Sequence, residues 1–271
     1  MNTQDQIRKN VSEAYTRAVQ QGTGCCGSKG AAARLAGYGT EAAEVPEALA
    51  DSFGCGNPVA FSDVGMGDTV LDLGSGAGLD LLLAAEKVGR AGRVIGVDMT
   101  DAMIERARAN AARAGAGNVE VRKGHIEDLP VDPGPVDWVI SNCVINLSPD
   151  KPRVFAEIAR VLKPGGRMLV SDLVAEDLPS WVAETPELYA SCIGGAIPES
   201  TYLRGLRDAG LIDVEVRTRR TYDAAELGSL IASEIPEGAR ATGCCGSWAV
   251  GVAAKELAGK VQSVSVYARK P

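Results

Sequence analysis

The sequence predicts an α/β protein built on a doubly wound parallel sheet, with an N-terminal extension and a small C-terminal insertion. Three observations support this prediction. Short apolar runs alternate with helix-like segments between residues 68 and 175, a glycine-rich turn follows the first run, and acidic residues lie at or near the ends of the runs. The 271 residues suffice for one large α/β domain with additions or for two small domains.

The bulk composition excludes several classes of function. A net charge of −7 argues against binding to nucleic acid or to an anionic membrane, and 4% aromatic residues leave few surfaces for base stacking. No apolar run approaches the roughly 20 residues of a membrane-spanning helix. Residues 1–15 are polar and lack the apolar region of a signal peptide, so we expect a cytoplasmic protein.

The N-terminal extension, residues 1–65, is expected to contribute little to the sheet. Residues 4–20 carry apolar side chains close to helical spacing and predict a helix. Residues 22–39 are rich in Gly, Ala and Cys and predict a loop with at most a short helix, and residues 53–58 predict a second loop.

The regular core is assigned to residues 66–175. Thr100 is a plausible N-cap for its second helix, and the third helix is expected to end at residues 163–166, which read Lys-Pro-Gly-Gly. Alternating strands and helices imply a parallel sheet with both faces covered and right-handed crossovers. The expected strands are 68–74, 93–98, 119–124, 136–142 and 166–173, and the expected helices are 79–88, 101–114 and 152–162.

The C-terminal part, residues 176–271, adds two more strands. We expect a helical stretch through Cys192, a helix at 200–209 and strands at 211–221 and 261–271. Residues 222–260 between these strands are expected to form an inserted helix and loop.

The turn after the first strand has the composition of a ligand-binding loop. Gly74, Ser75 and Gly76 follow the strand, and glycines there let the backbone approach a ligand closely. Asp72 precedes the loop, and Leu79 occupies the position where dinucleotide-binding loops prefer a third glycine. A carboxylate at this place repels pyrophosphate but attracts an amine, so the loop favours a ligand with an ammonium group and a ribose.

Further groups are expected at the carboxyl ends of the neighbouring strands. Asp98 ends the second strand and is suited to accept hydrogen bonds from both ribose hydroxyls. Ile126 and Glu127 follow the third strand and could flank an adenine edge. Met99 and Asn142 complete the expected cofactor site.

With these residues in order, the segment 68–174 resembles the class I methyltransferases that use S-adenosylmethionine (SAM). The resemblance implies a Rossmann-like sheet of seven strands, the last of them antiparallel. It also implies that SAM is bound by Asp72, Gly74, Gly76, Asp98 and the Ile126–Glu127 region. His125, the only histidine, is expected at the surface or beside the ligand rather than as a catalytic base.

The methyl acceptor is suggested by what the chain lacks and what it has in excess. Oxygen and nitrogen acceptors usually need a positioned base, and no such residue stands out after the fourth strand. The chain has seven cysteines, and thiolates select soft centres. Trivalent arsenic bound by three thiolates keeps a lone pair that can itself attack a methyl group, so no base would be required.

Four segments, FGCGNP, VIGVDMT, SNCVINLSPDK and LYASCIGGA, together resemble arsenite methyltransferases. This resemblance implies SAM-dependent methylation and detoxification of arsenite, or of an arsenic–thiol complex, with glutathione or thioredoxin as the reductant. The implied arsenic ligands are Cys55, Cys192 and either Cys244 or Cys245. The implied disulfide relay uses Cys25 or Cys26.

Alternative interpretations remain for several of these residues. The two copies of TGCCGS, at 23–28 and 242–247, could be zinc ligands, although their spacing fits zinc poorly, or vicinal disulfides, or cysteines without function. Cys143 is expected to pack or to line the SAM pocket without binding arsenic, so that Cys143→Ser would be mild. Lys151 and Arg153 are expected to be solvated charges at the start of a helix.

Two other functions are compatible with the sequence. The chain could methylate a small organic acceptor, in which case its cysteines are incidental. It could also be a thiol-rich metalloid-binding protein without catalytic activity.

Overall fold

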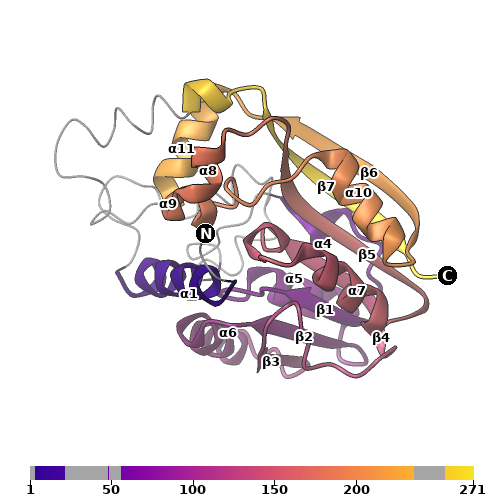
Figure 1. Ribbon diagram of the computed structural model, residues 1–271. Coiled ribbons are helices and arrows are strands. Elements are labelled where there is room, and N and C mark those ends of the chain that lie inside the picture. Colours follow the sequence, from indigo (N-terminus) through magenta and orange to yellow (C-terminus); the bar gives the residue numbers. More distant parts are fainter. Residues whose placement is uncertain (1–3, 22–47, 49–55, 235–253) are drawn as a thin grey trace.

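The computed structural model describes residues 4–21, 48, 56–234 and 254–271. Its centre is a seven-stranded sheet with the strand order β3-β2-β1-β4-β5-β7-β6 (Figure 1). The strands are β1 (Thr69–Leu73), β2 (Arg93–Asp98), β3 (Val119–Lys123), β4 (Val136–Asn142), β5 (Leu162–Ala175), β6 (Ile212–Thr221) and β7 (Val261–Arg269).

The first five strands are parallel, and β7 is antiparallel to both of its neighbours, β5 and β6. This order confirms the doubly wound sheet with an antiparallel last strand. The chain winds outward from β1 towards β3 and then returns to β4 on the other side of β1. Open parallel sheets bind ligands at this reversal, beyond the carboxyl ends of the strands.

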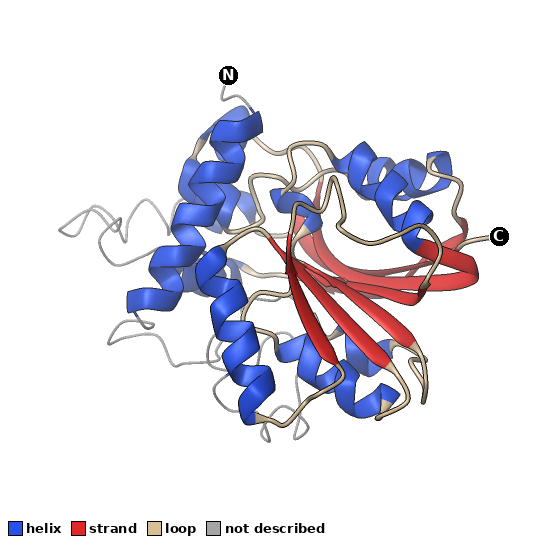
Figure 2. Ribbon diagram, turned by 90° about the horizontal axis from the view of Figure 1, so that it is seen from below, coloured by secondary structure: helices blue, strands red, loops and turns tan. Residues whose placement is uncertain are grey.

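Helices cover both faces of the sheet (Figures 1 and 2). One face packs against α4, α5 and α6, and the other packs against α7 and α10. The remaining helices, α1, α8, α9 and α11, gather beyond the carboxyl ends of the parallel strands (Figure 1). The helices are α1 (Gln4–Gln21), α4 (Pro58–Phe61), α5 (Leu79–Val88), α6 (Asp101–Arg113), η2 (Ile145–Leu147), α7 (Lys151–Val161), α8 (Ser180–Glu184), α9 (Pro186–Ala190), α10 (Glu199–Asp208) and α11 (Ala224–Glu234).

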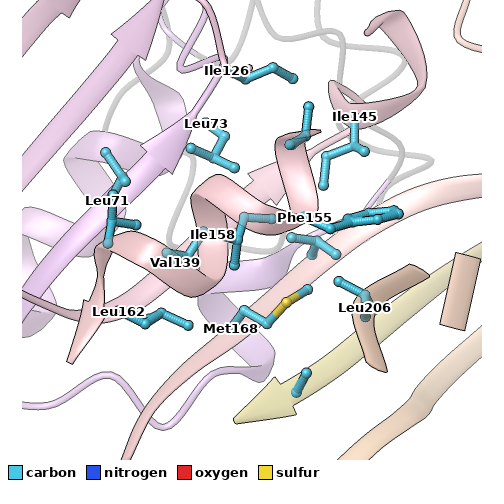
Figure 3. Packing of buried hydrophobic residues seen from close by; sticks show 14 of the residues in the cluster. Leu71, Leu73, Ile126, Val139, Ile145, Phe155, Ile158, Leu162, Met168 and Leu206 are labelled. Atoms are coloured by element: carbon cyan, nitrogen blue, oxygen red, sulfur yellow. The ribbon is translucent and has the colours of Figure 1, made fainter. Parts of the chain in front are cut away.

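Alternating side chains along the buried strands build two cores. In β1, Val70 points to the face of α5 whereas Leu71 and Leu73 point to the face of α7. Figure 3 shows the core between the sheet and the helices α7 and α10, where Phe155 of α7 lies among side chains of the sheet and of α10. Burying each large aliphatic or aromatic side chain contributes about 1.5–3 kcal/mol, so these cores hold the strand ends in fixed positions.

Most expected element boundaries are confirmed to within one or two residues, but the junction of α7 and β5 is not. Residues 163–166 do not separate a helix from a later strand, because β5 already begins at Leu162. The ladder with β4 shifts between the pairs Val136–Leu162 and Trp138–Arg167, so these four residues form a bulge within the strand. Gly165 has a φ of 77° there, and its N–H donates to the carbonyl of Lys270.

Two smaller expectations also need correction. The helical stretch up to Cys192 is two short helices, α8 and α9, and Cys192 follows the second. Thr100 occupies the N-cap position of α6, but its side chain makes no capping hydrogen bond. The expected loops at 22–39 and 53–55, and both TGCCGS segments, lie outside the described residues. Among the residues that are described, no helix is long and apolar enough to cross a membrane.

Candidate functional site

All nine residues that the sequence assigns to a cofactor line one pocket at the carboxyl ends of β1, β2 and β4. The pocket lies where the strand order reverses. Its predicted residues are Asp72, Gly74, Ser75, Gly76, Asp98, Met99, Ile126, Glu127 and Asn142.

The glycine loop after β1 adopts a shape that only glycine tolerates well. Gly74 and Gly76 have φ values of 64° and 51°. A Cβ on Gly74 would overlap the side chain of Val144, whereas a Cβ on Gly76 would meet nothing within 4 Å. The backbone at Gly76 therefore borders open space. The hydroxyl of Ser75 is buried and has no hydrogen-bond partner among the described residues, so it can bond to a ligand.

Three aspartates, Asp72, Asp80 and Asp98, share this pocket. Burial raises the pKa of Asp72 well above its ordinary value, and the charges of Asp80 and Asp98 raise it further. Burial also raises the pKa of Asp98, against hydrogen bonds from Thr100 and from the N–H of Gly76. Three acids that repel one another in a buried pocket favour a positively charged ligand.

Asp80 was not identified from the sequence, because it lies in the first turn of a helix and not at the end of a strand. Asn142 holds the Asp80 side chain in the pocket, because Asn142 Nδ2 donates to Asp80 Oδ2 at 3.3 Å. The same amide donates to the carbonyl of Gly56 at 2.6 Å and accepts from the N–H of Gly56 at 3.0 Å. Asn142 thereby joins the end of β4 to the segment that precedes α4.

The wall after β3 is held by Glu127. Its Oε1 accepts from Ser148 Oγ at 2.7 Å and pairs with Arg8 Nη2 at 3.3 Å. Ile126 and Glu127 are buried, whereas His125 is exposed and lines the pocket, as expected for a ligand-flanking residue.

Helix α1 closes one side of the pocket, which the sequence did not reveal. Arg8, Val11 and Tyr15 lie four residues apart or less, on one face of the helix, and line the pocket. Tyr15 donates to the carbonyl oxygen of Ala190 at 3.2 Å, so α1 also contacts the end of α9. The helical spacing of the apolar residues in this segment predicted a helix, but not what the helix covers.

The two described cysteines lie next to each other beside the pocket. Cys143 follows β4 and lines the pocket, and the Sγ of Cys192 donates to the carbonyl oxygen of Cys143 at 2.6 Å. Both belong to one buried apolar cluster. Cys143 takes part in a disulfide. The remaining predicted thiols, Cys25, Cys26, Cys55, Cys244 and Cys245, lie outside the described residues.

The two glycines that follow Cys192 are required by close packing. A Cβ on Gly195 would overlap the carbonyl oxygen of Asn146, and a Cβ on Gly194 would lie 2.8 Å from the backbone of Tyr189. The expectation of a tight turn after Cys192 is consistent with this packing.

The expectation that Lys151 is a solvated charge is wrong. Its Nζ donates to the carbonyl oxygens of Asn146 at 3.2 Å and Ser148 at 3.1 Å, and the residue is half-buried. Arg153, two residues later, is exposed as expected. Within the part of the chain that the structure describes, no cluster of His, Cys, Asp and Glu could hold a metal ion.

Comparison with known proteins agrees with this architecture. The family model for a methyltransferase domain matches residues 65–224. The chain is 42% identical over 230 residues to an arsenite methyltransferase of Halobacterium salinarum, a match that covers 78% of this chain and 59% of the relative. It is also 42% identical over 177 residues to an arsenite methyltransferase of Aquipseudomonas alcaligenes, covering 62% of this chain and 50% of the relative. The chain thus spans only half to three fifths of the length of these two relatives.

A solved structure is similar as well. The arsenic(III) S-adenosylmethionine methyltransferase of Chlamydomonas reinhardtii matches with a TM-score of 0.61 and 34% identity, over 88% of this chain and 71% of that protein. Since the family model covers more than half of the 271 residues, this chain belongs to the methyltransferase-domain family.

Proposed function

We propose that this chain transfers the methyl group of SAM to trivalent arsenic held by cysteine thiolates. One observation carries the proposal: the Cys143–Cys192 pair lies directly beside a buried pocket lined by three aspartates and Glu127. A soft-ligand site and a site for a cationic cofactor thus meet at the end of β4. The similarity to arsenite methyltransferases from two microorganisms supports it.

The pocket residues fit SAM. The orphan hydroxyl of Ser75 and the open space at Gly76 offer polar contacts and room for a ligand at the glycine loop. Asp98 would hold the ribose hydroxyls and Asp72 the ammonium group, while Ile126 and Glu127 would flank the adenine. When bound, SAM supplies a methyl group on a positively charged sulfur, which the lone pair of arsenic can accept.

The cysteines would bind the substrate as thiolates. Each protein thiol displaces one thiol of an arsenic–thiol complex, which leaves with the proton, and the arsenic keeps its lone pair. The proposed ligands are Cys55, Cys192 and either Cys244 or Cys245, with Cys25 or Cys26 in a disulfide relay. The contact between Cys192 and Cys143 leads us to give Cys143 a larger role than the sequence suggested, as a further sulfur ligand.

The reaction also needs a reductant, because only reduced thiols bind arsenic. Cys143 takes part in a disulfide, which must open before its sulfur becomes available. We infer that glutathione or thioredoxin fills this role in the cytoplasm, where thiols are kept reduced. Detoxification of arsenic would follow from the same reaction.

The purified chain, incubated with SAM, a thiol and arsenite, should yield methylated arsenicals in chromatography coupled to mass spectrometry. Absence of any methylated arsenical from the wild type under reducing conditions would overturn the proposal. Methylation of an organic acceptor instead would favour a small-molecule methyltransferase. Arsenite binding without turnover would favour a non-catalytic metalloid-binding protein.

Serine variants test the role of the thiols. Cys192→Ser and Cys143→Ser should each lose at least roughly 90% of the arsenite methylation, because a hydroxyl is a poor ligand for a soft centre. Binding of S-adenosylhomocysteine, measured by calorimetry, serves as the control and should change little. A mild effect of Cys143→Ser would instead support the prediction from the sequence that Cys143 lines the pocket without binding arsenic.

A further inference from the structure

The placement of Lys151 is not explained by the stability of its own helix. It is the first residue of α7, where the helix dipole disfavours a positive charge, and Asp150 before it already caps the helix through the N–H of Arg153. Partial burial of the ammonium group adds a further cost. Burial lowers the pKa of Lys151 to about 8, although the charges of Asp172, Cys192 and Glu127 oppose that shift. Because both the helix dipole and the partial burial disfavour this charge, we infer that Lys151 has a role outside its own helix.

The ammonium group of Lys151 contacts the partition segment, which we define as residues 142–148. This segment leaves the end of β4 and separates the cofactor pocket from Cys192. On the pocket side, Ser148 Oγ donates to Glu127 Oε1 at 2.7 Å, and Val144 packs so closely on Gly74 that no side chain would fit there. The partition segment thus sets the shape of the pocket.

On its other side, the partition segment holds the residues around the second thiol. Cys192 Sγ donates to the carbonyl oxygen of Cys143 at 2.6 Å, and the hydroxyl of Tyr189 donates to the carbonyl oxygen of Ser148 at 3.4 Å. Gly195 packs against the carbonyl oxygen of Asn146. Lys151 donates to two of these carbonyl oxygens, those of Asn146 and Ser148. Its ammonium group therefore ties down the part of the chain that both sites share.

We propose that Lys151 is a positioning residue, which holds the partition segment and so aligns the thiol-bound substrate with the methyl donor. The inference rests on the proposed function only for its effect on turnover. Each site keeps its own contacts without Lys151, so binding should survive. Alignment of the two reacting groups should suffer, and a displacement of about 1 Å can cost on the order of a hundredfold in rate.

Turnover and binding measurements separate this role from general destabilisation. In Lys151→Met, kcat for arsenite methylation should fall at least roughly tenfold, while the Kd for S-adenosylhomocysteine and the KM for arsenite should change less than about threefold. Lys151→Arg keeps the charge and the donors and should recover much of the rate. The matched control is Arg153→Met, which removes an exposed charge from the same turn of α7 and should have no effect. An unchanged kcat in Lys151→Met, or equal losses in kcat and in binding, would overturn the inference.

Amide hydrogen exchange tests the same contact without arsenic. The N–H groups of Asn146, Leu147 and Ser148 are hydrogen-bonded and should exchange slowly in the wild type. Exchange at Leu147 and Ser148 should be at least roughly tenfold faster in Lys151→Met but not in Lys151→Arg or Arg153→Met. Unchanged exchange would refute the positioning role even if the wild type failed to methylate arsenite, which would refute only the proposed function. Should Lys151→Met fail to fold, Lys151→Gln, which removes the charge but keeps a donor, is expected to show the same pattern.

Discussion

At the scale of single residues, both described cysteines adopt a backbone conformation that costs free energy. Cys143 and Cys192 have φ values of 58° and 63°, in the left-handed region that disfavours residues with a Cβ. Such a conformation costs roughly 1–3 kcal/mol and persists only where the surroundings enforce it. Here the N–H of Cys143 donates to the carbonyl of Ser171, and the N–H of Cys192 donates to the carbonyl of Tyr189. Both cysteines belong to one buried apolar cluster, so the strained backbone lies beside the proposed substrate site.

The raised pKa of Asp72 predicts a pH-dependent affinity for the cofactor. At acidic pH the free chain holds a proton on this carboxyl, and a cationic ligand must displace it. The affinity for S-adenosylhomocysteine, which carries an ammonium group, should therefore rise with pH through the raised pKa and then level off. Asp72→Asn should weaken binding by roughly 10- to 100-fold and flatten the pH dependence. Calorimetric titrations over a range of pH test this, with the exposed Asp63→Asn as the control. The same slope in Asp72→Asn as in the wild type would contradict the prediction.

Sequence alone identified the pocket residues that follow a strand, because their positions depend only on the alternation of strands and helices. It could not identify Arg8, Asp80 or Lys151 as site residues. Lys151 illustrates the reason: a lysine at a helix start is usually solvated, and only the carbonyl oxygens of the preceding turn decide otherwise. For Asp80, the deciding neighbour is Asn142, 62 residues away in sequence.

At the scale of elements, α1 covers one side of the pocket and packs against α6 and α9, and we expect it to act as a lid. Arg8 pairs with Glu127, Tyr15 donates to the carbonyl of Ala190, and Val11 is 2% exposed. The double variant Arg8→Ala/Tyr15→Phe removes both of these polar contacts, which should reduce the free energy that holds α1 over the pocket by roughly 2 kcal/mol. Dissociation of S-adenosylhomocysteine should then be at least roughly tenfold faster, while association changes little.

Stopped-flow fluorescence would measure both rates for the lid variant. Lys9→Ala is a suitable control, since Lys9 lies on the same helix with its side chain 67% exposed. Equal dissociation rates in the wild type and the double variant would show that α1 is not a lid for the cofactor.

The limits of sequence-based prediction also differ between elements. The strands β1, β2 and β4 are mostly apolar and buried, so their bounds were predictable within one or two residues. The start of β5 was not, because residues 163–166 carry the breaker pattern Lys-Pro-Gly-Gly. Lys270, the residue after β7, bonds to this segment: the N–H of Gly165 donates to the carbonyl of Lys270, and the N–H of Lys270 donates to the carbonyl of Gly166. A contact across more than a hundred residues leaves no local signal.

At the scale of the whole molecule, one sheet joins the central part of the chain to its C-terminal part. Strands β6 and β7, from the C-terminal part, pair into the same sheet as β5. The division into residues 1–65, 66–175 and 176–271 stays a prediction. The doubly wound parallel sheet was predictable from the alternation of elements, whereas the meeting of α1 with α9 above the pocket depends on tertiary contacts that have no periodic pattern.

The buried carboxyl groups of the central strands predict an unusual dependence of overall stability on pH. Burial raises the pKa of Asp172 to about 7, and it also raises those of Asp72 and Asp98. The folded state therefore binds more protons than the unfolded state between the ordinary carboxyl pKa and the raised ones. By linkage, the free energy of unfolding must fall as pH rises through this window. The opposing carboxylates, Glu120, Glu157 and Glu226, have lowered pKa values and titrate below the window.

Urea unfolding should therefore show a lower free energy of unfolding at about pH 7 than at about pH 5, with Asp172 alone accounting for roughly 2 kcal/mol. Asp172→Asn should reduce this slope, because the amide does not titrate. The exposed Asp63→Asn serves as the control and should leave the slope unchanged. Above about pH 8 the trend should reverse, since Lys151 has a lowered pKa and the folded state then binds fewer protons than the unfolded one. A stability that rises steadily from pH 5 to pH 7 would show that these carboxyls are not buried in the folded chain, and the acidic pocket would lose its basis.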